Sequence, residues 1–192
     1  MKSDLHLVRT GLWQWVQRTG LERFKLLQGT DEWVLRGTIL ILGDHGPAEA
    51  RYEVVCDGAW HTRSATVSIR EGRDRRELRI TAENGRWHEN GQPNENVNGC
   101  IDIDLGWSPS TNTLPIRRLC LDVGKASGTI MAAWVRFPDL KLEPLPQQYL
   151  RISEPLYRYS SRGGAFVAQL SVDDEGLVVE YEGLWSRVSQ TK

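Results

Sequence analysis

Two aspartates near the middle of the chain, Asp102 and Asp104, carry the most suggestive chemistry in the sequence. They alternate with the apolar residues Ile101, Ile103 and Leu105, and a period of two is typical of a strand with one apolar and one acidic face. Neighbouring carboxylates can act as acid–base groups, bind a metal or pair with arginines. The strand therefore predicts either a ligand site or an architectural ion pair, and the sequence leaves both open.

Arginine side chains are the expected partners of these carboxylates. Arg63 and Arg136 lie on other expected strands, while Arg117 and Arg118 follow the acidic strand after a turn that contains Asn112. A guanidinium group can hold a carboxylate or a phosphate through two hydrogen bonds. Because adjacent strand residues point to opposite faces, we expect only one of Arg117 and Arg118 to face inward, and we assign Arg117 to the candidate site.

Tryptophan is unusually frequent, with eight residues against three phenylalanines. Indole combines a large apolar face with an N–H donor, which suits stacking against a sugar ring, although core packing is the alternative for each tryptophan. Trp134 and Arg136 are expected to face the same cavity as the two aspartates. The predicted ligand-binding residues are therefore Trp60, Arg63, Asp102, Asp104, Asn112, Arg117, Trp134 and Arg136.

The sequence predicts no catalytic residue, no metal site and no cofactor. Its four histidines are scattered, and no serine or cysteine lies in a nucleophile-elbow motif. Cys56, Cys100 and Cys120 are odd in number and lack metal-ligand spacing, so we expect them to be reduced thiols.

Short alternating segments separated by turn residues predict a single all-β domain over residues 1–192, with little helix. Residues 57–58 are interpreted as a bend inside one long strand, and residues 112–115 as one helical turn. Asn84-Gly85 is a two-residue hairpin signal. Residues 129–137, apolar on both faces, are expected at the centre of the sheet. The other expected strands are residues 21–26, 33–42, 51–56, 60–70, 78–82, 101–105, 119–123, 149–152, 156–160, 166–172 and 177–185. Of these, 149–152 and 156–160 are expected to be aromatic edge strands.

Charge and hydropathy exclude several kinds of partner. Lysine and arginine number 24 and aspartate and glutamate 25, so the net charge of −1 gives no global attraction for nucleic acid. No apolar run approaches the roughly 20 residues of a membrane helix, and the first residues lack the features of a signal peptide. We therefore expect a cytoplasmic protein without an integral membrane segment, as a monomer or homodimer.

Several motifs, in order along nearly the whole chain, resemble the bacterial family called "putative glycolipid-binding", formerly a domain of unknown function. The resemblance implies a curved antiparallel sheet rolled into an open barrel, or β-roll, similar to bacterial lipoprotein carriers. It also implies an amphipathic small molecule, a lipid or glycolipid, as the partner. The motifs that carry it are Gly-Leu-Glu at 20–22, Cys-Asp-Gly-Ala-Trp-His-Thr-Arg at 56–63, Gly-Cys-Ile-Asp-Ile-Asp-Leu-Gly at 99–106, the segment 111–119, Ala-Ala-Trp-Val-Arg-Phe-Pro-Asp-Leu at 132–140 and Asp-Glu-Gly-Leu-Val at 174–178.

Three functions remain open at this point. The first is a binding protein whose concave face takes an amphipathic ligand, with apolar walls and polar groups at the mouth. The second is an enzyme of carbohydrate or lipid metabolism that uses Asp102 or Asp104 as an acid–base group, although both lie on one strand instead of facing each other across a cleft. The third is a structural protein with a filled core and no ligand.

Overall fold

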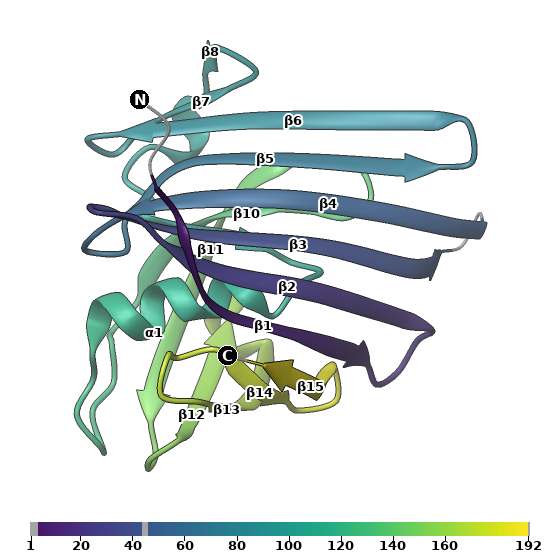
Figure 1. The fold of residues 1–192 in the computed structure, drawn as a ribbon. Helices are drawn as coiled ribbons and strands as arrows, with labels where there is room; N and C mark the ends of the chain where they lie inside the picture. The colour runs from purple at the N-terminus through teal and green to yellow at the C-terminus, as the bar shows by residue number, and fades with distance from the viewer. Residues whose placement is uncertain (1–3, 44–45, 192) are drawn as a thin grey trace.

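The computed structural model describes residues 4–43 and 46–191 and confirms the all-β prediction, with one short α-helix and three 3₁₀ turns (Figure 1). The first half of the sheet contains β1 (His6–Trp15), β2 (Gly20–Gln28), β3 (Glu32–Gly43), β4 (Gly46–Asp57), β5 (Thr62–Glu71), β6 (Asp74–Glu83), β7 (Arg86–Glu89) and β8 (Gln92–Pro93). The second half contains β9 (Asp102–Leu105), β10 (Ile130–Val135), β11 (Leu142–Arg151), β12 (Leu156–Ser161), β13 (Phe166–Val172), β14 (Val178–Tyr181) and β15 (Trp185–Thr191). The helical elements are η1 (Glu95–Val97), η2 (Ser110–Asn112), α1 (Thr113–Leu119) and η3 (Arg162–Gly164).

All fifteen strands belong to one sheet, in the order β8-β7-β6-β5-β4-β3-β2-β1-β15-β14-β13-β12-β11-β10-β9. Neighbours pair antiparallel except β9 and β10, which are parallel, so the expectation of a purely antiparallel sheet needs this one correction. The sheet is rolled, with β10–β13 crossing behind the layer of β1–β6 (Figure 1). Its edge strands, β8 and β9, are not paired to each other, so the roll does not close into a barrel.

Side chains fill the interior of the roll. Alternation along the long strands places every second residue in one hydrophobic core, because successive strand side chains point to opposite faces. In β4 the inward residues are Ala48, Ala50, Tyr52 and Val54. The edge strand β9 has buried residues on both faces, because the roll covers it. In the segment 129–137, Ala132, Ala133 and Val135 are buried but Thr129 and Met131 are exposed. The segment is therefore only partly buried, and its strand β10 lies next to the edge of the sheet instead of at its centre.

The structure corrects several expected elements. A strand, β1, precedes residues 21–26, and residues 57–61 form the turn of the β4–β5 hairpin instead of a bend in one strand. Residues 149–152 and 156–160 lie in interior strands, and residues 177–185 are divided between β14 and β15. The Asn84-Gly85 hairpin is confirmed, with φ angles of 50° and 74° at the two turn residues.

The sequence pattern predicted a single helical turn at residues 112–115 and a strand at 119–123. The structure instead has helix α1 in this segment. Pro115 lies in its first turn, where a missing N–H costs little, and Cys120 ends it in the left-handed conformation with φ 43°. Thr113 to Ile116 are buried, whereas Arg117 is exposed. Both arginines thus lie on a helix, and the strand argument for choosing between them does not apply.

Candidate functional site

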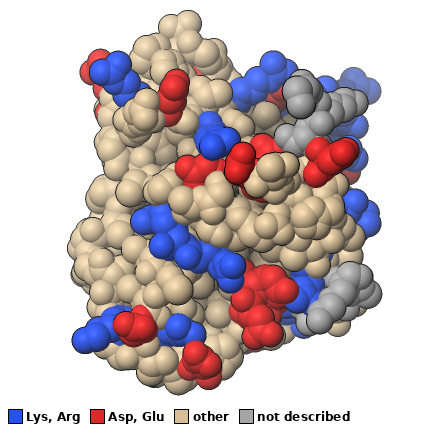
Figure 2. Space-filling model, turned by 60° about the vertical axis from the view of Figure 1, so that its left-hand side comes forward, with Lys and Arg blue, Asp and Glu red and all other residues tan. Residues whose placement is uncertain are grey.

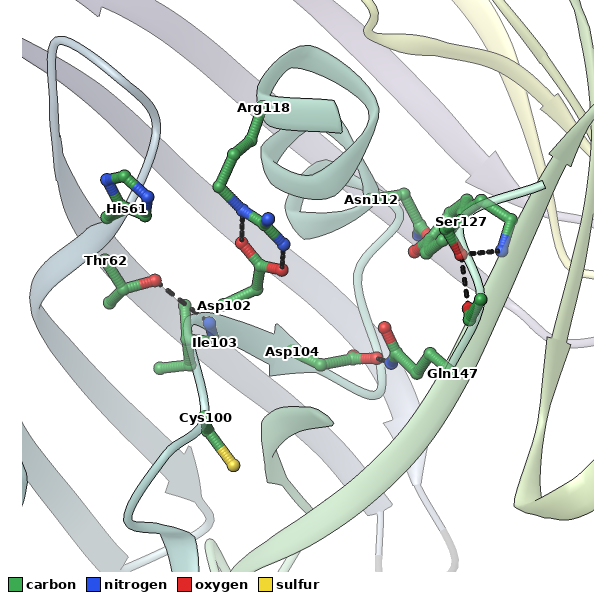
Figure 3. A network of polar contacts seen from close by, with 12 residues as sticks. His61, Thr62, Cys100, Asp102, Ile103, Asp104, Asn112, Arg118, Ser127 and Gln147 are labelled. Carbon is green, nitrogen blue, oxygen red and sulfur yellow. Dashed lines mark hydrogen bonds and ion pairs between the residues drawn. The ribbon is translucent and has the colours of Figure 1, made fainter. Parts of the chain in front are cut away.

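Asp102 joins the edge strand β9 to helix α1 through an ion pair. The Arg118 Nε donates to Asp102 Oδ1 at 3.1 Å, and the Arg118 Nη2 donates to Oδ2 (Figure 3). Asp102 is 1% exposed, and burial raises the pKa of its carboxyl while Arg118 opposes that rise. This carboxylate is fully engaged by protein groups. The prediction that at least one of the two aspartates pairs with an arginine is confirmed, with Arg118 as the partner.

Asp104 lies on the same face of β9 but in a different environment. It accepts a hydrogen bond from the Gln147 side-chain amide of β11 and has no arginine partner among the ion pairs of the described residues (Figure 3). Burial raises the pKa of Asp104 to about 6, the charge of Asp102 adds to the rise, and the Gln147 hydrogen bond opposes it. Asp104 therefore changes its charge near neutral pH.

Asp104 borders a cavity of about 210 Å³ whose lining includes five aromatic residues. The remaining lining includes Ser108, Asn112, Ser161 and Arg162. An apolar cavity with a few converging polar groups is the usual form of a small-molecule site. The aromatic residues that line this "aromatic pocket" are Trp134, Tyr159, Phe166, Tyr181 and Trp185.

Trp134 sits directly beside Asp104, because the two residues are register partners in β10 and β9. Its indole packs against Gly106, where an added Cβ would lie 2.1 Å from the Trp134 Nε1, so only glycine leaves room for this ring. The Arg162 guanidinium carbon stands 4.9 Å from the centre of the Trp134 ring. The pocket thus combines an aromatic wall with one cation and one titratable carboxyl.

Hydrogen bonds hold the polar floor of the aromatic pocket in place. The Asn112 Oδ1 accepts from the Tyr149 hydroxyl at 2.9 Å, and the Asn112 amide donates to the Pro109 carbonyl at 3.3 Å. The Ser108 hydroxyl donates to Glu22 Oε1 at 2.8 Å. Since both side chains are buried and already bonded, the floor is preorganised.

Glu22 is a buried carboxyl that the sequence analysis did not single out. It is 0% exposed, and its Oε1 also accepts from the Tyr52 hydroxyl at 2.5 Å. Burial raises the pKa of Glu22 to about 8, although the hydrogen bonds from Tyr52 and Ser108 oppose the rise. Its inward position in the alternating strand 21–26 was the available signal.

The structure brings together three of the eight predicted ligand-binding residues, Asp104, Asn112 and Trp134, around one pocket. Tyr159, Phe166, Tyr181, Trp185 and Arg162 were not predicted, because they come from strands and a turn distant in sequence. Alternating aromatic residues in 156–160 gave a weak signal for an aromatic face.

The other five predicted residues do not line the aromatic pocket: Asp102, Trp60, Arg63, Arg117 and Arg136. Trp60, with φ 69° in the β4–β5 turn, stacks on Trp33 with ring centres 4.6 Å apart, and the Arg117 guanidinium carbon lies 5.6 Å from its ring. Arg63 is exposed beside an open polar hollow of about 950 Å³.

Arg136 lies just beyond β10 with its side chain 40% exposed. It pairs with Glu143 at 3.4 Å and with Asp139 at 3.6 Å, and its guanidinium carbon is 5.9 Å from the centre of the Trp134 ring. The expected acidic partner is present, but the lining of the aromatic pocket does not include Arg136.

Three further observations concern metal ligands, thiols and membrane-spanning helices. Within residues 4–43 and 46–191, no group of three or more His, Cys, Asp and Glu side chains is placed to hold a metal ion. All three cysteines are free thiols, and burial raises the pKa of Cys100 to about 11 and that of Cys56 further. The described helices include none long and apolar enough to cross a membrane.

The chain thus folds as an open, rolled all-β sheet with a small pocket partly lined by aromatic residues. The chain belongs to the family described as "Putative glycolipid-binding", whose model matches residues 10–187. It is also similar to a DUF1089 family protein from Pseudomonas aeruginosa, known from a crystal structure, with a TM-score of 0.80 and 31% identity. That match covers 90% of this chain and 96% of the other. A comparison with curated proteins gives no match.

Proposed function

We propose that this protein binds the sugar head of a glycolipid in the aromatic pocket. The observation that carries the proposal is the position of Asp104 at the foot of an aromatic wall that includes Trp134. A pyranose ring has an apolar C–H face that stacks on aromatic rings and hydroxyl groups that donate to carboxylates. The family description supports this ligand class.

Each polar group of the pocket has a role in this proposal. Ionised Asp104 accepts hydrogen bonds from ligand hydroxyls, while the Arg162 guanidinium donates to ligand oxygens. Gln147 holds the Asp104 carboxylate in place, so little ordering is needed when the ligand binds.

The size of the pocket limits what it can hold. A volume of about 210 Å³ is below the range of about 300–1,000 Å³ common for drug-sized ligands, so we expect it to hold about one sugar ring. The interior of the roll is filled by side chains, which leaves the acyl chains outside the pocket. The mouth carries Phe166, which is 36% exposed and supplies an apolar contact for them.

The competing functions fit the geometry less well. An enzyme with Asp102 and Asp104 as an acid–base pair would need both carboxyls at the substrate, but Asp102 is buried and bonded to Arg118. A ligand-free structural role does not account for a half-buried carboxyl at the foot of an aromatic cavity. The free thiols favour a reducing compartment, which supports the cytoplasm as the place of action.

Calorimetric titration with octyl glucoside and octyl galactoside, and with octyl phosphocholine as the head-group control, tests the proposal. We expect binding of at least one glycoside below its micelle concentration and a loss of about ten-fold or more in Trp134→Leu, since stacking on an aromatic ring is removed. Trp33→Leu, which removes a partly buried indole outside the pocket, is the matched control and should keep the affinity. Equal affinity in Trp134→Leu and the wild type, or no binding of any glycoside, would overturn the proposal.

A further inference from the structure

One end of the β1–β6 layer exposes four large apolar side chains next to the turns. At this end, on the right of Figure 1, the β1–β2 and β5–β6 turns lie beside the end of β3 and the start of β4. Leu21 and Leu40 are register partners on the outer face of β2 and β3, and Leu42 follows two residues after Leu40. We call these four residues the apolar tip: Val16 is 54% exposed, Leu21 43%, Leu40 58% and Leu42 56%.

The leucines of the apolar tip border one shallow hollow of about 640 Å³, together with Pro47 and Arg70. Single exposed leucines are ordinary on a protein surface, but a contiguous apolar patch marks a contact surface. The tip is therefore expected to be covered by a partner.

Positive charge surrounds the tip on the outer face of the same strands. Arg18, Arg23 and Arg70 are exposed, Lys25 is partly exposed, and none of these four has an ion pair among residues 4–43 and 46–191. The Arg18 guanidinium carbon stands 5.6 Å from the ring centre of Trp15. Two acidic residues at this end are in ion pairs, Glu49 with Arg51 at 2.9 Å and Glu71 with Arg76 at 3.0 Å.

The row of cations continues away from the tip into a groove of about 690 Å³. In that groove Arg36 pairs with Glu53, and Arg75 and Arg79 pair with Glu77. The lining of this groove includes Arg23 and Lys25 and carries more cationic than acidic side chains, so the excess of positive charge lies in the groove, on the same outer face of β2 and β3 as Leu21 and Leu40. The whole chain has a net charge of −1. Away from the tip, the face in Figure 2 shows both signs of charge interspersed with uncharged surface.

We propose that the apolar tip docks on an anionic phospholipid bilayer. Leucine and valine side chains enter the boundary between head groups and acyl chains, while arginine and lysine extend to the lipid phosphates. Protein surfaces that bind bilayers commonly combine an apolar surface, neighbouring basic residues and a tryptophan at the interface.

The distribution of charge argues against two other partners for the apolar tip, a second copy of this chain and a nucleic acid. A second copy in a two-fold dimer would bring the same cations, Arg18, Arg23 and Arg70, against each other across the interface. A nucleic acid would contact the cations through phosphates but would leave the exposed leucines in water.

The apolar tip is physically connected to the aromatic pocket. The Val16 N–H donates to the Leu184 carbonyl at 2.8 Å, and Leu184 lines the pocket. The rings of Trp15 and Trp185 lie 5.0 Å apart, and Trp185 is also in the pocket wall. Docking of the tip therefore brings the pocket to the level of the bilayer surface, where a glycolipid head group lies. The docking itself does not rest on the proposed sugar binding.

Co-sedimentation with vesicles that contain no glycolipid tests the proposal. We expect the wild type to sediment with phosphatidylserine–phosphatidylcholine vesicles and to be released by salt, because added salt screens the attraction. The double variant Leu40→Ser/Leu42→Ser should lose about ten-fold or more in partitioning. Arg23→Gln and Arg70→Gln should each lose about five-fold on anionic vesicles only, as one cation near the surface is removed.

Matched controls carry the same substitutions away from the tip. Val123→Ser replaces a side chain that is 53% exposed in the loop after α1, and Arg158→Gln removes an exposed cation from β12. Both should partition as the wild type does. Wild type that stays in the supernatant overturns the proposal, as does a Leu40→Ser/Leu42→Ser variant that sediments normally. A dimer that dissociates in the double variant, without vesicle binding by the wild type, would assign the tip to a second copy.

Discussion

Arg118 of helix α1 and Asp102 of strand β9 form a two-point ion pair that attaches the only α-helix among the described residues to an edge of the sheet. The Arg118 side chain is 12% exposed and that of Asp102 is 2% exposed, so water screens the pair little. Asp104 follows Asp102 by two residues on β9, and Trp134 is the register partner of Asp104 on the neighbouring strand β10. Asn112, in the floor of the pocket, directly precedes α1. The ion pair therefore positions one wall and the floor of the aromatic pocket.

Removal of one partner from this ion pair should be costly. Asp102→Asn leaves a buried guanidinium without its counter-charge and should lower the free energy of unfolding by about 3–5 kcal/mol in urea denaturation. Arg117→Met, on the same helix but exposed, is the control and should cost less than about 1 kcal/mol. The joint variant Asp102→Leu/Arg118→Met should recover most of the loss, because no unpaired charge remains. A cost below about 1 kcal/mol for Asp102→Asn would contradict this role.

Glu22 should make the protein less stable as the pH rises. Its pKa is about 8 in the folded chain against an ordinary value of 4.5, so between these values the folded state binds a proton that the unfolded state has lost. The free energy of unfolding should therefore fall from about pH 4.5 to about pH 8, by about 1.4 kcal/mol per pH unit and up to about 5 kcal/mol in all, and level off above. Glu22→Gln keeps an oxygen acceptor for Tyr52 and Ser108 and should remove this slope. A wild type and a variant with parallel pH profiles in urea denaturation would disprove the assignment.

Asp104 should make ligand binding depend on pH. Because its pKa is about 6, the carboxylate becomes neutral as the pH falls through that value and then accepts hydrogen bonds less well. Glycoside affinity is expected to fall below about pH 6 in the wild type, whereas Asp104→Asn should bind weakly at every pH. Titration calorimetry across this range measures both curves. A flat wild-type curve would show that Asp104 does not contact the ligand.

Gly106 should be required for the shape of the aromatic pocket. Its missing Cβ leaves the space that the Trp134 indole occupies, so Gly106→Ala should displace the ring and reduce glycoside affinity about ten-fold or more. Gly58→Ala, where the nearest atom would be 3.9 Å from the new Cβ and no positive φ is required, is the control. Near-ultraviolet circular dichroism reports the tryptophan environment, and an unchanged spectrum with unchanged affinity would contradict the prediction.

The local sequence pattern was sufficient to predict the fold class and many of the strands. The alternation at Asp102-Ile103-Asp104-Leu105 correctly predicted a strand with both carboxylates on one face, because the period of two is a property of the extended backbone itself. Asn84-Gly85 likewise fixed a hairpin through its preference for positive φ angles. The family resemblance correctly gave a rolled sheet.

Only the tertiary structure decided which of these residues meet. Register and rolling bring Trp134, Tyr159 and Trp185 from three strands into one wall, and no spacing along the chain encodes that encounter. Helix formation after Asn112 turned Arg118, not Arg117, toward Asp102, because the direction of a side chain depends on the element that carries it. Residue type determined which chemistry was available, while long-range packing determined that Asp102 became an ion-pair partner and Asp104 the carboxyl of a pocket.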